Sequence, residues 1–277
     1  MRVAGSNPVV RSRSAAFVRV AMLSVAVLLM SGCAPRGAAK PDAYIAAASD
    51  TRDAFTELAA DLSSSAGVEV EFVFGSSGLL REQVLNGAPY DVYVSANGEF
   101  VNEIVNAGFA RPENVREYAR GVVALIARDQ LALPPAPTSG DESASSSSII
   151  EVLGDAGRIA IANPAHAPYG VAAKEMLQSL GIYEGVANRL ILAENVADAV
   201  RIVEAGEADY GLVALALVRS REHRAIDTSL YQPIRQTAAL TRRGEENRAA
   251  RAFYDALVSP KGVALLRKYG FVVEAQE

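Results

Sequence analysis

The sequence predicts an α/β fold of two lobes, each a mostly parallel sheet flanked by helices. Strand-like apolar runs alternate with segments of helical periodicity, and the connections are short, which favours parallel strands with helices on the sheet faces. The chain has 277 residues, enough for two lobes with a large core. A turn from a strand directly into a helix also occurs twice in each half.

In the first half, apolar strands are expected at 43–47, 68–74 and 90–94, each followed by a helix. The Gly-Ser-Ser-Gly turn at 75–78 joins the second strand to a helix whose face carries Leu80 and Val84.

In the second half, strands are expected at 122–127, 158–162, 189–192 and 210–214, and the stretch 231–241 should be extended and cross back to the first lobe. We therefore expect 42–121 with 236–277 to form lobe 1 and 122–235 to form lobe 2. Because residues 133–148 are rich in Pro and Ser, we expect a flexible surface loop there.

The first 32 residues are typical of a signal peptide. Four arginines precede or flank an uncharged run at 20–30, which is too short to span a bilayer as a stable helix. Small residues then precede Cys33, the only cysteine, as in the lipobox of bacterial lipoproteins. An ordinary signal peptide with an incidental cysteine is the alternative. We expect lipidation of Cys33, a tether at 33–41, and an exported protein, periplasmic or at the cell surface, anchored to the membrane through the lipid.

The charge balance excludes several classes of partner. Removing residues 1–32 leaves 23 basic against 32 acidic residues, a net charge of −9. Such a surface argues against nucleic acid and anionic lipid as partners. Neither His166 nor His223 has neighbours with metal-ligand spacing, so no metal coordinated directly by side chains and no cofactor is expected.

Four strand-to-helix turns are the candidate site. A helix that begins directly after a strand points unpaired N–H groups and the positive end of its dipole beyond the strand, where an anion binds. No Lys or Arg occupies these turns, so the sequence indicates a small oxyanion held by neutral donors. The turns are Ala48-Ser49-Asp50, Gly75-Ser76-Ser77-Gly78, Ala167-Pro168-Tyr169-Gly170 and Glu194-Asn195-Val196.

Several of these segments, in this order, resemble the periplasmic molybdate-binding proteins of ABC transporters (the ModA type), over about residues 43–272. The matching segments are Ala46-Ala47-Ala48-Ser49, Gly75-Ser76-Ser77-Gly78, Asn86-Gly87-Ala88-Pro89-Tyr90-Asp91, Val94-Ser95-Ala96, Ile161-Ala162-Asn163-Pro164, Ala167-Pro168-Tyr169-Gly170 and Tyr269-Gly270. The resemblance implies a two-lobe, Venus-flytrap periplasmic binding protein. As a monomer, it would capture molybdate or tungstate and deliver it to the permease subunits of an ABC transporter.

The resemblance also implies the residues that bind the oxyanion. The hydroxyls of Ser49 and Ser77, with their amides, and the amides of Tyr169 and Val196 would donate to it. Asp50 and Ser76 are further candidates.

The chain departs from the family pattern at two positions. Ala214 stands where many members place a tyrosine hydroxyl on the anion, and Asp50 stands where one branch can carry asparagine. A phosphate or sulfate binder of the same fold is the alternative. Phosphate is protonated near neutral pH, and Asp50 could accept that proton. An enzyme is not expected, since no nucleophile elbow and no His–acid pair is placed to activate a serine.

Overall fold

The computed structural model describes residues 41–129, 131–134 and 142–274. The predicted signal peptide, Cys33 and nearly all of the tether therefore lie outside the described residues. Among those described, no helix combines the length and apolar character needed to cross a membrane.

The first lobe is built on a five-stranded sheet with the order β2-β1-β3-β10-β4. Strand β1 pairs in parallel with both β2 and β3. Strand β10 is antiparallel to β3 and β4, so the other four strands run in one direction. The strands are β1 (Ala43–Ala48), β2 (Val70–Gly75), β3 (Val92–Ser95), β4 (Ala110–Gly121) and β10 (Ile234–Thr241).

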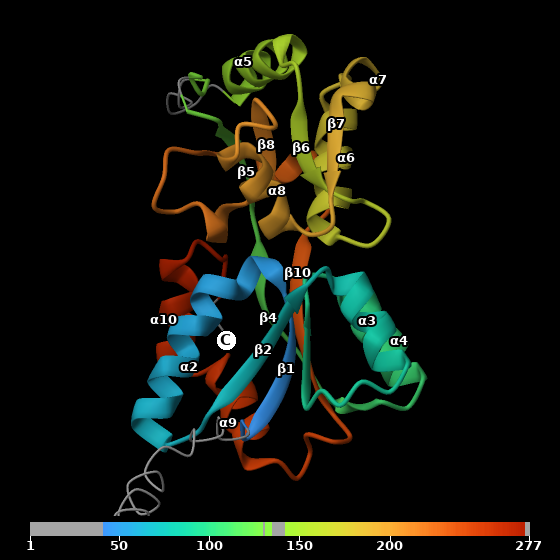
Figure 1. The fold of residues 1–277 in the computed structure, drawn as a ribbon, viewed down its shortest axis with the longest axis vertical. Helices are drawn as coiled ribbons and strands as arrows, with labels where there is room; N and C mark the ends of the chain where they lie inside the picture. The colour runs from blue at the N-terminus through green and yellow to red at the C-terminus, as the bar shows by residue number, and fades with distance from the viewer. Residues whose placement is uncertain (1–40, 130, 135–141, 275–277) are drawn as a thin grey trace, which may run out of the picture. The chain divides into compact units, whose positions relative to one another are not determined.

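Helices cover both faces of this sheet (Figure 1): α2, α9 and α10 lie on one side, and α3 and α4 on the other. On the first side, Phe55 of α2 packs edge-on against Phe253 of α9, with ring centroids 5.1 Å apart. On the other side, Leu80 and Tyr93 belong to a second buried cluster. The helices are α2 (Arg52–Ala66), α3 (Ser77–Leu85), α4 (Gly98–Asn106), α9 (Arg248–Ala256) and α10 (Pro260–Lys268).

The second lobe repeats the arrangement with the strand order β7-β6-β8-β5-β9. Strand β6 is parallel to β7 and β8, whereas β5 is antiparallel to β8 and β9. The strands are β5 (Val123–Ala127), β6 (Ile159–Ala162), β7 (Leu190–Ala193), β8 (Tyr210–Ala214) and β9 (Arg224–Ala225).

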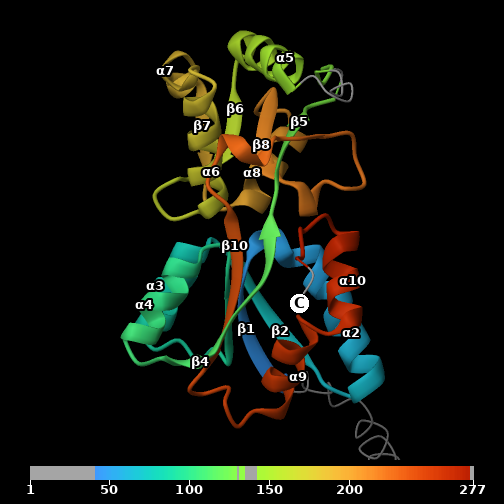
Figure 2. The same cartoon turned by 180° about the vertical axis from the view of Figure 1, so that it is seen from behind.

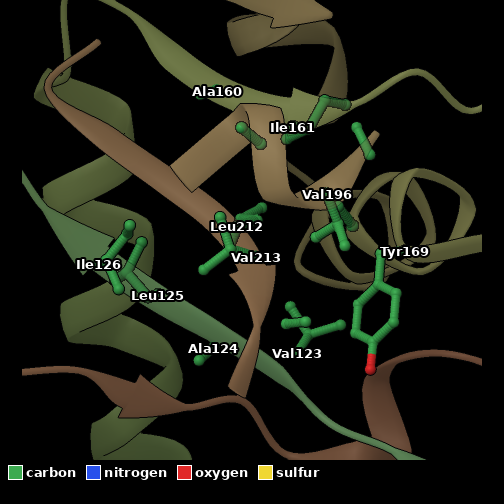
Figure 3. Close-up of a cluster of buried hydrophobic side chains, with 14 of the residues drawn as sticks. Val123, Ala124, Leu125, Ile126, Ala160, Ile161, Tyr169, Val196, Leu212 and Val213 are labelled. Atoms are coloured by element: carbon green, nitrogen blue, oxygen red, sulfur yellow. The ribbon is translucent and has the colours of Figure 1, made fainter. Parts of the chain in front are cut away.

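The core of the second lobe consists of the buried strands β5, β6 and β8 with the inner faces of their helices. Figure 3 shows Val123 to Ile126, Leu212 and Val213 side by side in this core. The helices are α5 (Glu142–Asp155), α6 (Pro168–Ser179), α7 (Tyr183–Val186) and α8 (Val196–Glu204). Short 3₁₀ turns are η1 (Ser49–Thr51), η2 (Ala187–Arg189), η3 (Leu215–Leu217) and η4 (Thr228–Leu230).

Two connections join the two sheets. Strand β4 runs directly into β5 through Val122, and the chain returns from β9 into β10 (Figure 2). The predicted crossing by the stretch 231–241 is therefore confirmed, since β10 pairs with β3 and β4 of the first sheet.

The structure corrects one prediction and adds two strands. Residues 142–148, expected in a loop, form the first half of α5, because Ile149 and Leu153 further along the same helix are buried in the core. Of the remaining loop, 135–141 lies outside the described residues. Strand β4, twelve residues rich in charge, and the two-residue β9 were not predicted.

Candidate functional site

All four predicted strand-to-helix turns line one cavity. Each is a helix start: η1 after β1, α3 with Ser76 as its N-cap, α6 with Ala167, and α8 with Asn195. Two belong to the first lobe and two to the second. The lining residues are Ala48, Ser49, Asp50, Gly75, Ser76, Ser77, Ala96, Ala167, Pro168, Tyr169 and Val196.

Three backbone amides at these turns have no partner. The first N–H groups of a helix cannot bond within it. The N–H groups of Ser77, Tyr169 and Val196 donate to no other described residue, whereas the side chain of Asn195 accepts from the next two amides of α8. The cavity thus collects free backbone donors from both lobes.

The hydroxyl of Ser77 is positioned by its neighbours. Its Oγ accepts a hydrogen bond of 3.1 Å from the Ala96 amide, which leaves its own proton free to donate. The Tyr93 hydroxyl donates to the Ser77 carbonyl at 2.8 Å and fixes the start of α3. Ser49 is also buried, and its Oγ accepts a long bond of 3.5 Å from the Ala197 amide. Both serines therefore keep a proton to donate.

The hydroxyl of Ser76, in contrast, is already used between the lobes. It donates to the His166 carbonyl at 2.6 Å and lies 2.8 Å from His166 Nδ1. The Gly78 amide donates to the same carbonyl at 2.9 Å, and a Cβ at Gly78 would lie 2.7 Å from it. His166 acts as a structural hydrogen-bonding residue, and the turn after β6 rests on the start of α3.

Behind the cavity lies a buried polar cluster. The Gln236 amide donates to Asp50 Oδ2 at 2.6 Å and accepts at Oε1 from the Tyr118 hydroxyl at 3.3 Å. The Tyr169 ring packs near Val196 in Figure 3. Asp50 Oδ1 and Tyr169 Oη are buried without a hydrogen-bond partner of good geometry, yet they lie close enough for each group to shift the other's pKa.

The electrostatics of this cluster depend on one carboxyl. Burial raises the pKa of Asp50 to about 6, although the Tyr169 hydroxyl, the Gln236 amide and two backbone amides pull it down. Burial and the Asp50 charge together raise the pKa of Tyr169 well above its usual value. Tyr169 therefore stays neutral at physiological pH, whereas Asp50 titrates just below physiological pH.

The cavity is tight as the lobes stand. Its free volume is about 10 Å³, which is near the minimum for one water molecule. An anion with four oxygens therefore requires the helix starts to move apart.

A larger groove of about 600 Å³ lies among α4, α6, β4 and β10. Of the four turns it includes only Pro168, which has no N–H to donate, and its three acids, Glu99, Glu117 and Glu175, outnumber the two arginines Arg116 and Arg235. Arg235 pairs with Glu117, and Arg116 pairs with an acid of α9. An acidic surplus without free cations does not suit an anion, so the small cavity is the candidate site.

The structure thus brings Ser49, Ser77, Tyr169 and Val196 together, with Asp50 and Ser76 beside them. Ala214, at the end of β8, is fully buried. Sequence reasoning missed Gln236 and Tyr118. A glutamine inside an apolar strand was the available signal for Gln236, because a buried polar side chain needs a partner.

The fold and this interlobe cavity define a class of protein, the two-lobe extracytoplasmic solute-binding proteins. Residues 43–272 match the family model described as bacterial extracellular solute-binding protein. The chain therefore belongs to the bacterial extracellular solute-binding protein family.

Within this family the chain is similar to proteins named ModA. It is 34% identical to the molybdate-binding protein ModA of Rhodobacter capsulatus over 91% of this chain and 96% of that protein. The Escherichia coli protein of the same name is 28% identical, over 82% of this chain and 88% of its own length. The solved periplasmic molybdate-binding protein of Azotobacter vinelandii superposes with a TM-score of 0.75 at 29% identity, covering 84% of this chain and all of that chain.

Proposed function

We propose that this protein captures molybdate or tungstate between its lobes and delivers it to the permease of an ABC transporter. The observation that carries the proposal is the single cavity at which four helix starts from both lobes meet without a cationic side chain. The relatives named as molybdate-binding proteins support this choice of cargo.

The donors suffice for a doubly charged guest. Hydrogen bonds to a charged group contribute about 1.5–3 kcal/mol each, and a helix terminus adds about 0.3–1 kcal/mol. The hydroxyls of Ser49 and Ser77 and the amides of Ser77, Tyr169 and Val196 make five donors. Neutral donors also disfavour a guest that must itself donate a proton, since they offer no acceptor for it.

The proposal also covers the movement of the lobes, the export of the protein and its anchoring. Lobe 1 (42–121 with 236–277) and lobe 2 (122–235) close on the anion, and the contact of Ser76 and Gly78 with His166 forms part of the closed arrangement. The protein has no catalytic role. It is exported by the signal peptide at 1–32, anchored through lipidated Cys33 and the tether 33–41, and active as a monomer.

Thermal unfolding and calorimetry with a panel of tetrahedral oxyanions test the proposal. A ligand that binds only the folded state raises the melting temperature, because it adds about 2.7 kcal/mol to the free energy of unfolding at a hundredfold excess over Kd. Molybdate and tungstate should do so strongly, and sulfate and phosphate weakly. Absence of stabilisation by any of them would contradict the proposal.

Ser77→Ala tests the site itself. The loss of one charge-assisted bond should weaken molybdate binding by more than tenfold, since 1.4 kcal/mol corresponds to a factor of ten. Because the Ala96 amide also loses its acceptor, the ligand-free melting temperature should fall too, and calorimetry separates the two effects. Ser64→Ala, on the exposed side of α2, is the matched control and should leave affinity unchanged. Unchanged affinity in Ser77→Ala would remove this hydroxyl from the site.

Phosphate or sulfate is the second candidate cargo. Asp50, beside the cavity, can accept the proton that monohydrogen phosphate carries. Molybdate carries no such proton at neutral pH. Stabilisation by phosphate equal to that by molybdate, abolished in Asp50→Asn, would favour this cargo over the first.

A further inference from the structure

Asp50 is an unusual neighbour for an anion. It is the only acid among the residues that line the cavity, and no lysine or arginine lines it. Its side chain is 1% exposed, so solvent screens its charge weakly. An ionised Asp50 would therefore repel a dianion bound beside Ser49, its neighbour in the chain.

Among the described residues no cation faces Asp50, and only neutral donors stabilise its charge. From β10 it faces the neutral amide of Gln236, from β4 the hydroxyl of Tyr118, and from α6 that of Tyr169. The adjoining turn η3 consists of leucines and alanine. The first turn of α8 brings Val196 to the cavity, and its nearest charge, Asp198, pairs with Arg201.

One atom of this carboxyl lacks a partner. Asp50 Oδ2 accepts from Gln236, while Oδ1 is buried and unpaired, as is the facing Tyr169 hydroxyl. A buried polar atom left unpaired is costly. The Tyr169 hydroxyl can donate to an ionised Oδ1 or accept from a protonated one, so a proton on Oδ1 keeps this pairing possible and removes the negative charge next to the anion.

We propose that Asp50 makes anion capture proton-coupled: its carboxyl takes up one proton, held on Oδ1 facing Tyr169, when a doubly charged oxyanion occupies the cavity. This inference rests on the proposed function, because it requires the anion to bind in this cavity. The proton comes from solvent, and no covalent bond of the anion changes. The protonation of Asp50 then sets the pH range in which the anion binds, because the ionised carboxyl repels a dianion and the protonated one does not.

The size of the effect follows from linkage. With a pKa of about 6 as the lobes stand, Asp50 is about nine-tenths ionised at pH 7 and about one-tenth at pH 5. Binding should therefore take up about 0.9 proton at pH 7 and about 0.1 at pH 5. The affinity should fall nearly tenfold between pH 7 and pH 8 while the bound form stays protonated.

Calorimetric titration of the full-length protein with sodium molybdate and sodium tungstate measures this uptake in two buffers that differ in ionisation enthalpy, Hepes and Tris at pH 7 and 8, and acetate and piperazine at pH 5. Asp50→Asn keeps the shape of the side chain and should show no uptake and a flat affinity from pH 5 to 8. Asp53→Asn, exposed one turn away, should behave as wild type.

Binding without proton uptake at pH 7 would overturn the coupling and leave the proposed function intact. Uptake that persists in Asp50→Asn would overturn the assignment to this residue. Absence of binding heat with both anions at pH 5, 7 and 8 would overturn the proposed function and this inference with it. Should Asp50→Asn fail to fold, the wild-type protein tests the coupling alone. Proton uptake that is the same at pH 5 and pH 7 would then contradict it.

Discussion

Replacing Asp50 with asparagine should stabilise the ligand-free protein above pH 6 and leave its stability unchanged near pH 4. The Asp50 carboxyl has a pKa of about 6 in the folded protein against 3.8 for an unperturbed aspartate. Between these values the folded state binds more protons than the unfolded state, so the free energy of unfolding falls as the pH rises. The asparagine variant has no carboxyl at this position, so its free energy of unfolding does not fall for this reason as the pH rises.

The magnitude follows from the pKa difference. About two pKa units at 1.36 kcal/mol each give about 3 kcal/mol at neutral pH. For a chain of this size, 1 kcal/mol corresponds to about 2–4 °C, so the melting temperature should rise by about 6–12 °C at pH 8. Asparagine retains an acceptor for the amide of Gln236 and supplies an amide donor on the side of Tyr169.

Urea unfolding at pH 4 and pH 8, without oxyanions in the buffer, measures the difference. Asp53→Asn is a control of opposite sign, because an ionised acid in the first turn of α2 favours the helix by about 0.3–1 kcal/mol. A stability difference between Asp50→Asn and wild type that is the same at both pH values would refute the reasoning, since it would arise from packing and not from titration.

Three further substitutions test packing around the site. Gly170→Ala places a Cβ 2.1 Å from the carbonyl oxygen at the end of β6. Chemical unfolding should show that the free energy of unfolding falls by about 3 kcal/mol or more. The control Gly154→Ala, whose Cβ meets no atom within 4 Å, should be neutral or stabilising. Gly78→Ala crowds the His166 carbonyl, so calorimetry should show weaker anion binding with a small change in ligand-free stability. Phe253→Ala empties a fully buried aromatic position and should cost about 3–5 kcal/mol in the same unfolding assay.

The helix starts of the site were predictable because their signals are local. In each case an apolar strand ends in a short turn, and the next helix begins within a few residues, as at Ser77 and Val196. The Gly-Ser-Ser-Gly and Ala-Pro-Tyr-Gly turns therefore place their amides at the sheet edge whatever the rest of the chain does.

Strand β4 could not be predicted in this way. Its sequence is charged and lacks a regular apolar alternation, because it is an edge strand whose neighbour in the sheet is β10, apart from a single bridge between Arg120 and Val272. That partner lies more than a hundred residues further along the chain. The loop expected at 142–148 was wrong for a related reason: Ser and Glu tolerate a helix, and the burial of Ile149 and Leu153 decides its length.

The direction of side chains was the other limit. Local turn chemistry does not distinguish Ser76 from Ser77, and only the family resemblance favoured Ser77. In the structure the hydroxyl of Ser76 bonds to His166 of the second lobe, while that of Ser77 keeps its proton beside the cavity. The turn chemistry predicts that a helix begins there, and only the packing of the other lobe shows which hydroxyl is free.

The location of the Asp50 cluster links charge to the movement of the lobes. Gln236 lies on β10, and Gly121, at the end of β4, would place a Cβ 2.2 Å from the Tyr169 hydroxyl. These two strands lead into the two connections between the lobes, and Tyr169 belongs to the opposite lobe from Asp50. Any separation of the lobes must therefore move Tyr169 relative to Asp50 and hydrate the carboxyl, which lowers its pKa. Closing the lobes and protonating Asp50 thus favour one another through the same few atoms.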